Sequence, residues 1–170
     1  PHLRELELHC SELLNSVALK KMNSLRALYL SYIESFDFKD IAACKDLWAL
    51  EIDARRVLNL ESISNFNNLS RLNILSDGIV SIKEIPRLDN LQHLRIKSYN
   101  LSSLEGIQRF PKSYSLDFSA CQKLKDIQAI KVLTELIELY IPPHIPFEDS
   151  RVQQIKRQSL EIRHKPLSGC

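Results

Sequence analysis

The side chains best suited to acid–base chemistry in this chain are its five histidines, at positions 2, 9, 93, 144 and 164. Histidine titrates near neutral pH and often serves as a general acid or base. His93 and Asp117 could become cross-strand neighbours in a sheet and so form a pair of this kind. No nucleophile, pocket or glycine-rich loop accompanies them, which favours an ordinary surface ion pair. The sequence therefore predicts no enzymatic activity.

The remaining reactive residue types predict neither a metal nor a cofactor. Four cysteines, at 10, 44, 121 and 170, form no C-x-x-C pair and no tight zinc spacing. The three glycines stand apart, without a phosphate-binding pattern. Cys44 falls on an apolar repeat position, where a small core residue is expected. Reduced structural thiols favour a reducing compartment, so we expect a cytoplasmic protein.

Composition narrows the functional classes further. An apolar fraction of 44% and a charged fraction of 26% are ordinary for a soluble globular protein of 170 residues. The net charge of +2 gives no overall attraction to nucleic acid or to an anionic membrane. No apolar run is long enough to span a bilayer. We expect a single domain over residues 1–170, with a protein as its partner.

A repeat determines which elements position these residues. The motif L-x-x-L-x-[LI] recurs every 22 residues, beginning at Leu3, Leu25, Leu47, Leu69 and Leu91. The register continues through Leu116, then through Leu139 after a one-residue insertion, and we place the last unit at Arg157-x-x-Leu160-x-Ile162. Apolar alternation predicts a strand with one buried face, and the later apolar spacing of three suits a 3-10 turn. Such units bury their apolar edges only by stacking.

The pattern resembles leucine-rich repeat proteins of the 22-residue class found in internalins and in the regulatory subunit of protein phosphatase 1. The segment Leu104-Glu-Gly-Ile107 is similar to the I-x-x-L-E-G-L style of that class. The resemblance covers almost the whole chain and implies an α/β solenoid, a right-handed arc of about eight 22-residue units. It also implies a parallel β-sheet on the concave face and 3-10 or irregular turns on the convex face.

Members of the class usually place an asparagine just after each strand, and this chain lacks that feature. Here that position holds Ser11, Ile33, Arg55, Asp77, Tyr99, Cys121 and His144. Serine, cysteine and aspartate can replace the asparagine hydrogen bonds in part. We therefore expect irregular turns where Ile33, Arg55 and Tyr99 follow their strands.

The two ends of the chain differ from the middle. The chain opens directly on a repeat motif, so we expect a fragment without its N-terminal cap that can dimerise through exposed repeat ends. Prolines at 142, 143 and 146 exclude a regular helix or central strand there. Asp149 and Ser150 then predict the capped start of a short helix that carries Val152 and Ile155.

The outward strand positions are the candidate binding residues, because the core does not need them. They form an acidic first half and a basic patch, and Leu75 adds an apolar side chain. Aromatic residues and arginine are the usual anchors of protein interfaces. The predicted partner-binding residues are Tyr29, Glu51, Asp53, Arg71, Leu75, His93, Arg95, Lys97 and Asp117. Changing Arg95 to glutamate is expected to weaken binding and to leave the melting temperature nearly unchanged.

Protein recognition through the concave face is the function that these features favour, with an acidic partner on the basic patch. The acidic half argues against nucleic acid. Three alternatives stay open. The chain could be the substrate-recognition part of a larger enzyme such as a ubiquitin ligase, or a secreted or surface protein that interacts with a host. The exposed strands could also form a solvated charged sheet with no partner.

Overall fold

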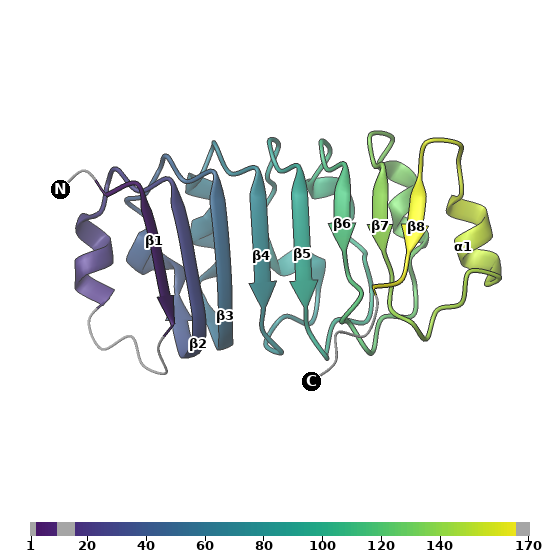
Figure 1. The fold of residues 1–170 in the computed structure, drawn as a ribbon, viewed down its shortest axis with the longest axis horizontal. Helices are drawn as coiled ribbons and strands as arrows, with labels where there is room; N and C mark the ends of the chain where they lie inside the picture. Colours follow the sequence, from purple (N-terminus) through teal and green to yellow (C-terminus); the bar gives the residue numbers. More distant parts are fainter. Residues whose placement is uncertain (1–2, 10–15, 166–170) are drawn as a thin grey trace.

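The computed structural model describes residues 3–9 and 16–165, in which eight parallel strands form one sheet in chain order (Figure 1). The strands are β1 (Glu5–His9), β2 (Ala27–Asp37), β3 (Ala49–Leu58), β4 (Arg71–Leu75), β5 (His93–Lys97), β6 (Ser115–Asp117), β7 (Glu138–Tyr140) and β8 (Glu161–Arg163). Each strand pairs with the strand of the next unit, which confirms the predicted stack of repeats.

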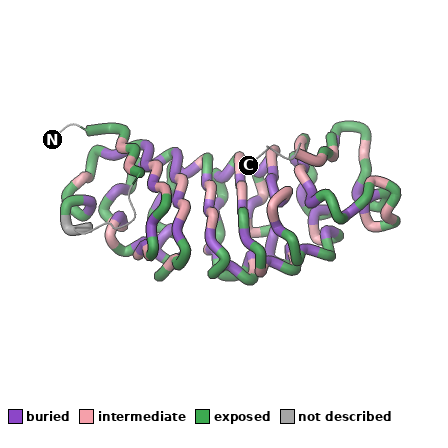
Figure 2. The backbone as a smooth tube through the Cα atoms, turned by 60° about the horizontal axis from the view of Figure 1, so that its bottom comes forward, coloured by how far each residue is buried: buried purple, intermediate pink, exposed green. Residues whose placement is uncertain are grey.

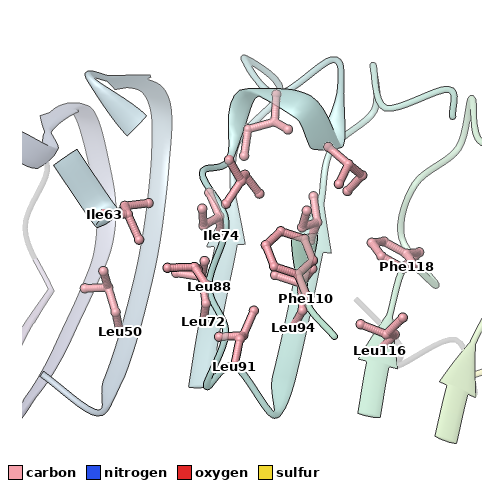
Figure 3. Packing of buried hydrophobic residues seen from close by; sticks show 14 of the residues in the cluster. Leu50, Ile63, Leu72, Ile74, Leu88, Leu91, Leu94, Phe110, Leu116 and Phe118 are labelled. Carbon is pink, nitrogen blue, oxygen red and sulfur yellow. The ribbon is translucent and has the colours of Figure 1, made fainter. Parts of the chain in front are cut away.

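The leucine positions of the repeat build the core. Leu50, Leu72, Leu94 and Leu116 lie side by side in the register of neighbouring strands, each at most 1% exposed. Figure 3 shows these side chains pointing into the space between the strands and the returning chain. Because the buried residues form one cluster along the stack, each unit depends on its neighbours for its apolar contacts.

The return of each unit is a 3-10 turn in most of the stack, as the apolar spacing of three predicts. These turns are η1 (Ser16–Lys21), η2 (Phe38–Ile41), η3 (Leu60–Asn65), η4 (Ile82–Glu84), η5 (Ile107–Arg109) and η6 (Gln128–Val132). Figure 1 shows η1 beside β1 at the end of the stack and the later turns behind the sheet, and Figure 2 shows the stack as a shallow arc whose ends curve to the same side. The open sheet face therefore lines the concave side, which leaves its outward residues accessible.

The last unit returns through a helix, α1 (Ser150–Ile155), as the sequence predicts. The Asp149 side chain accepts a hydrogen bond from the Arg151 backbone N–H at 2.8 Å, and Val152 and Ile155 pack into the core.

The predicted register of the last strand is wrong by two residues. Leu139 pairs with Ile162, not with Leu160, and Tyr140 pairs with Arg163, not with Glu161. The step between units is thus one residue longer than 22 here, as it is between β6 and β7, where Leu116 pairs with Leu139. Glu161 consequently lies beside Glu138, and Arg163 moves from the third outward column to the middle one.

Serine and cysteine side chains replace part of the missing asparagine contacts between units. The Ser76 hydroxyl donates to the Arg55 carbonyl at 3.2 Å, and the fully buried Ser98 hydroxyl donates to the Ile79 carbonyl at 2.6 Å. The Cys121 thiol donates to the Ile96 carbonyl at 3.1 Å. Asp77 accepts from the Tyr99 backbone N–H at 2.7 Å. The expected substitution is confirmed for Cys121 and Asp77. Ser76 and Ser98 lie one residue before the predicted position, and Ser11 lies outside the described residues.

The irregularity expected at Ile33 and Arg55 takes the form of two long strands. The register between β2 and β3 shifts between Leu30 and Ile33, and pairing then continues to the end of both strands. Tyr32 lies at this bulge with a φ of 64°, a left-handed conformation that is uncommon for a residue other than glycine. The two strands consequently run past the end of β4, and the Tyr32 side chain is 73% exposed.

Replacing Gly106 with alanine is expected to lower the free energy of unfolding by about 1–2 kcal/mol. Gly106 has a φ of 101°, and an added Cβ would lie 3.0 Å from Lys83 Cγ. Gly78 is the matched control, since its Cβ would meet only Ser76 Oγ at 3.4 Å. Urea denaturation followed by circular dichroism would compare the two variants. Equal losses of stability would contradict a conformational requirement at Gly106.

Candidate functional site

The first and middle outward columns are confirmed over the first seven strands. The third is confirmed only for His9 with Ser31 and for Asp53, Leu75 and Lys97, because the register shifts within β2 and the pairing of β6 and β7 ends earlier. Tyr29, Glu51, Asn73, Arg95, Asp117 and Tyr140 stand in one row, each beside its counterpart on the next strand. Strand pairing at a one-unit step places like positions about 4.8 Å apart, so the side chains of a row touch. The row gathers charges of both signs on the concave face, together with two tyrosines.

Three of the predicted residues line a hollow at the middle of β3 and the carboxyl end of β4, with a volume of about 450 Å³. These are Asp53, Leu75 and Lys97, and we call the space the β3–β4 hollow. Tyr32, Glu34, Arg55 and Asp77 also line it, and sequence reasoning missed them. Tyr32 and Glu34 reach this space because β2 continues past its bulge, which the repeat pattern does not encode. Leu75 and Tyr32 give the hollow apolar surface beside the Lys97 ammonium.

Four other predicted residues line a second hollow of about 250 Å³, which we call the β5–β6 hollow. They are Arg71, His93, Arg95 and Asp117, and they are joined by Ser115, Glu138, Tyr140 and Lys165. Sequence reasoning missed Lys165 because it follows the last strand. Tyr140 could have been predicted from the sequence, since it stands in the same row as Asp117. The Ser115 hydroxyl donates to Glu138 Oε2 at 3.2 Å.

The predicted pair of His93 and Asp117 is wrong. In the register His93 stands beside Ser115, whereas Arg95 stands beside Asp117. His93 instead hydrogen-bonds through Nε2 to the Tyr114 hydroxyl, and the two rings meet edge to face with centroids 4.4 Å apart. Burial, and then the nearby Arg71 guanidinium, lower the pKa of His93. His93 therefore makes a packing contact with Tyr114 on the sheet face, while the nearby Glu138 opposes the lowering of its pKa.

Asp117 is the centre of a charged cluster, and its side chain is 10% exposed. Its Oδ1 accepts from the Ser119 backbone N–H at 3.0 Å and from the Ser119 hydroxyl at 2.6 Å. Its Oδ2 lies 3.3 Å from Arg95 Nε and 2.5 Å from Lys165 Nζ. Burial alone raises the pKa of Asp117, but the contacts with Lys165 and Ser119 outweigh burial and lower it.

This cluster changes the expected result of reversing Arg95. A glutamate at position 95 would lie against the Asp117 carboxylate, so the substitution is expected to cost stability as well as any binding. Arg71 and Lys97 are better probes of the basic patch. Both are exposed, and within residues 3–9 and 16–165 neither forms an ion pair.

Tyr29 and Glu51 lie outside both hollows, on β2 and β3. Both are half-buried, and Glu51 Oε2 accepts a hydrogen bond from Asn73 Nδ2 at 2.7 Å. Burial raises the pKa of Tyr29, and the carboxylates of Glu5, Glu51 and Glu7 raise it further against the opposing Arg71. Tyr29 is thus a protonated hydroxyl among carboxylates, which makes it a hydrogen-bond donor on the acidic half of the face.

Comparison with known proteins identifies the fold of this chain. No protein-family model and no curated protein matches the chain. Among solved structures, an internalin from Listeria monocytogenes is similar, with a TM-score of 0.65 and 19% sequence identity over 94% of this chain. This chain has the leucine-rich repeat fold. It spans 47% of the internalin chain, about half its length.

The leucine-rich repeat domain buries both cysteines that the structure describes. The Cys44 thiol donates to the Met22 carbonyl at 3.3 Å, and burial raises its pKa to about 11. Burial likewise raises the pKa of Cys121 to about 12. A thiol with so high a pKa is a poor nucleophile, which agrees with the expected structural role. Cys10 and Cys170 lie outside the described residues.

The other described histidines of the leucine-rich repeat domain are spread along the stack, and His2 lies outside the described residues. His144 Nε2 donates to the Leu124 carbonyl at 2.7 Å, and His9 lies 3.0 Å from Glu7 at the other end. In the described part of the chain, no group of three or more His, Cys, Asp or Glu side chains is arranged to hold a metal ion. Across the same residues, no helix combines the length and apolar character needed to cross a membrane.

Proposed function

We propose that this leucine-rich repeat domain recognises a protein partner through its concave face and performs no chemistry of its own. The observation that carries the proposal is the β3–β4 hollow, where apolar and charged side chains share one open space. Leu75 and Tyr32 are not needed by the core, yet they expose apolar surface beside Lys97. Apolar and aromatic anchors ringed by charges are typical of protein-binding surfaces.

The charges of the face favour a partner segment with acidic groups. Arg71 and Lys97 project from adjacent strands, and neither is neutralised by a carboxylate of the described chain. Arg55, by contrast, lies 3.4 Å from Glu34, and Arg95 lies against Asp117. Arg71 begins β4 and Lys97 ends β5, so an extended segment that runs along these strands could place one acidic side chain beside Arg71, another beside Lys97 and an apolar one in the β3–β4 hollow. A solvated sheet without a partner would need no such exposed apolar surface.

Changing both Arg71 and Lys97 to glutamate is expected to abolish capture of the partner and to leave folding intact. Both side chains are exposed, so the melting temperature should change by no more than about 2 °C. The measurement is a pull-down from cell lysate with mass spectrometry, comparing the variant with the wild-type domain. Proteins recovered by the wild type and lost from the variant are the candidate partners.

The matched control changes Lys45 and Lys156 to glutamate, because both are exposed lysines outside the strands and carry the same charge change. The control should recover the same proteins as the wild type. Equal recovery by all three proteins would overturn the proposal for this face. Loss from both variants would point to net charge and not to the concave surface.

A further inference from the structure

The chain that follows β8 places a lysine on the concave face. After Arg163 it turns back toward β6 (Figure 1). His164 fixes the turn, because its ring stacks on Phe147 with centroids 4.2 Å apart and its Nε2 donates to the Ile145 carbonyl at 3.0 Å. The next residue, Lys165, then reaches past β7 to Asp117 on β6. Lys165 belongs to no strand, yet it lines the β5–β6 hollow.

Two strands of the sheet supply a site for an ammonium group, which we call the lysine socket and define as Asp117 and Tyr140. Lys165 Nζ lies 2.5 Å from Asp117 Oδ2 and 5.2 Å from the centroid of the Tyr140 ring. A carboxylate and an aromatic face are the two groups that bind alkylammonium ions best in proteins. Ser119 holds the other carboxylate oxygen, so Oδ2 stays directed at the cation.

Folding does not require Lys165 at this position. Arg95 already lies 3.3 Å from Asp117 Oδ2, from the neighbouring strand, and neutralises the carboxylate. Lys165 is therefore a second cation on one carboxylate, and its side chain remains 38% exposed. The Asp117 side chain is only 10% exposed, so Lys165 covers it from the solvent side, and a competing cation can approach from that side and take the place of the ammonium group. The socket can accept another ammonium or guanidinium group without loss of the core.

We infer that the lysine socket binds a lysine or arginine side chain of an extended partner segment, and that Lys165 occupies it in the free protein as an intramolecular competitor. This inference rests on the proposed function and specifies the partner further. The segment carries a basic residue for Asp117 and Tyr140, and acidic groups for Arg71 and Lys97. The basic residue of the segment then faces Asp117, and its acidic residues face Arg71 and Lys97. This pairing of opposite charges fixes the position of the segment along the strands.

The test uses a fluorescein-labelled hexalysine peptide and fluorescence anisotropy at low ionic strength. Lys165→Gln is expected to bind the peptide about five-fold tighter than the wild-type protein, because the competitor has been removed. Lys156→Gln makes the same change in net charge outside the sheet and is expected to match the wild type within about two-fold. A Lys165→Gln affinity no higher than that of Lys156→Gln would overturn the inference.

Two double variants test whether the increase in peptide affinity depends on the lysine socket. Adding Asp117→Asn or Tyr140→Leu to Lys165→Gln is expected to return the affinity to the wild-type value, with circular dichroism as the check on folding. Tyr140→Leu decides the matter if the Asp117 variant does not fold, because it leaves the carboxylate network in place. A full five-fold gain in the folded double variants would place the peptide elsewhere. The measurement leaves Arg71 and Lys97 unchanged, so its failure and the failure of the proposed function are separate results.

Discussion

Replacing Leu94 with alanine is expected to lower the free energy of unfolding by about 2–5 kcal/mol. Leu94 is 1% exposed and stands between Leu72 and Leu116, which are both fully buried in the register. Those neighbours are held by their own strands and cannot move in to fill the space, so a cavity remains. For a chain of this size the melting temperature should fall by about 5–15 °C, measured by circular dichroism.

Leu75→Ala is the control for that substitution, because the same atoms are removed from the adjacent strand. Leu75 is half-buried on the concave face and lines the β3–β4 hollow. Its loss should cost less than about 1 kcal/mol, since water already reaches the side chain. Similar losses for Leu94→Ala and Leu75→Ala would contradict the assignment of inward and outward positions on which the binding proposal depends.

Replacing Asp117 with asparagine is expected to lower the free energy of unfolding by about 1–3 kcal/mol at pH 7. The amide is nearly the same size, but it carries no charge for Arg95 and Lys165 and can no longer accept at both oxygens. Chemical denaturation of the variant and the wild type would measure the difference. Asp53→Asn, on the same face but without the paired cations, should change stability by less than about 0.5 kcal/mol.

The difference between wild type and Asp117→Asn should depend on pH in a defined direction. The folded protein holds the pKa of Asp117 below its ordinary value, so the carboxylate stabilises the fold fully above that ordinary value, about 3.9. The contribution is lost as the pH falls through the lowered pKa, where the folded state also takes up the proton. The two proteins should therefore converge in stability in strong acid. A difference that stays constant from pH 7 downward would show that the charge of Asp117 contributes nothing.

The leucine pattern predicted the parallel stack, the 3-10 returns and the first and middle outward rows of the first seven strands, and the capping residues at Asp149 and Ser150 predicted the helix. Alternation and a fixed period encode these features, because a residue such as Leu94 can satisfy its burial in only one register. The rows also separate His93 from Asp117, so the sequence contained the reason to reject that pair. Of the nine binding residues predicted from this pattern, seven line one of the two hollows, and Tyr29 and Glu51 lie outside both.

Only the tertiary structure determined which other residues complete the concave face. Tyr32 enters the β3–β4 hollow because β2 bulges and continues past the end of β4, a local backbone choice that apolar spacing does not record. Lys165 enters the β5–β6 hollow because the chain folds back after β8. The last strand pairs two residues later than predicted, because the step from β7 to β8 is one residue longer than 22 and the leucine at 160 does not take the inward position. Periodicity encodes what each unit does with its neighbours, whereas bulges, insertions and returning segments depend on contacts formed once the stack exists.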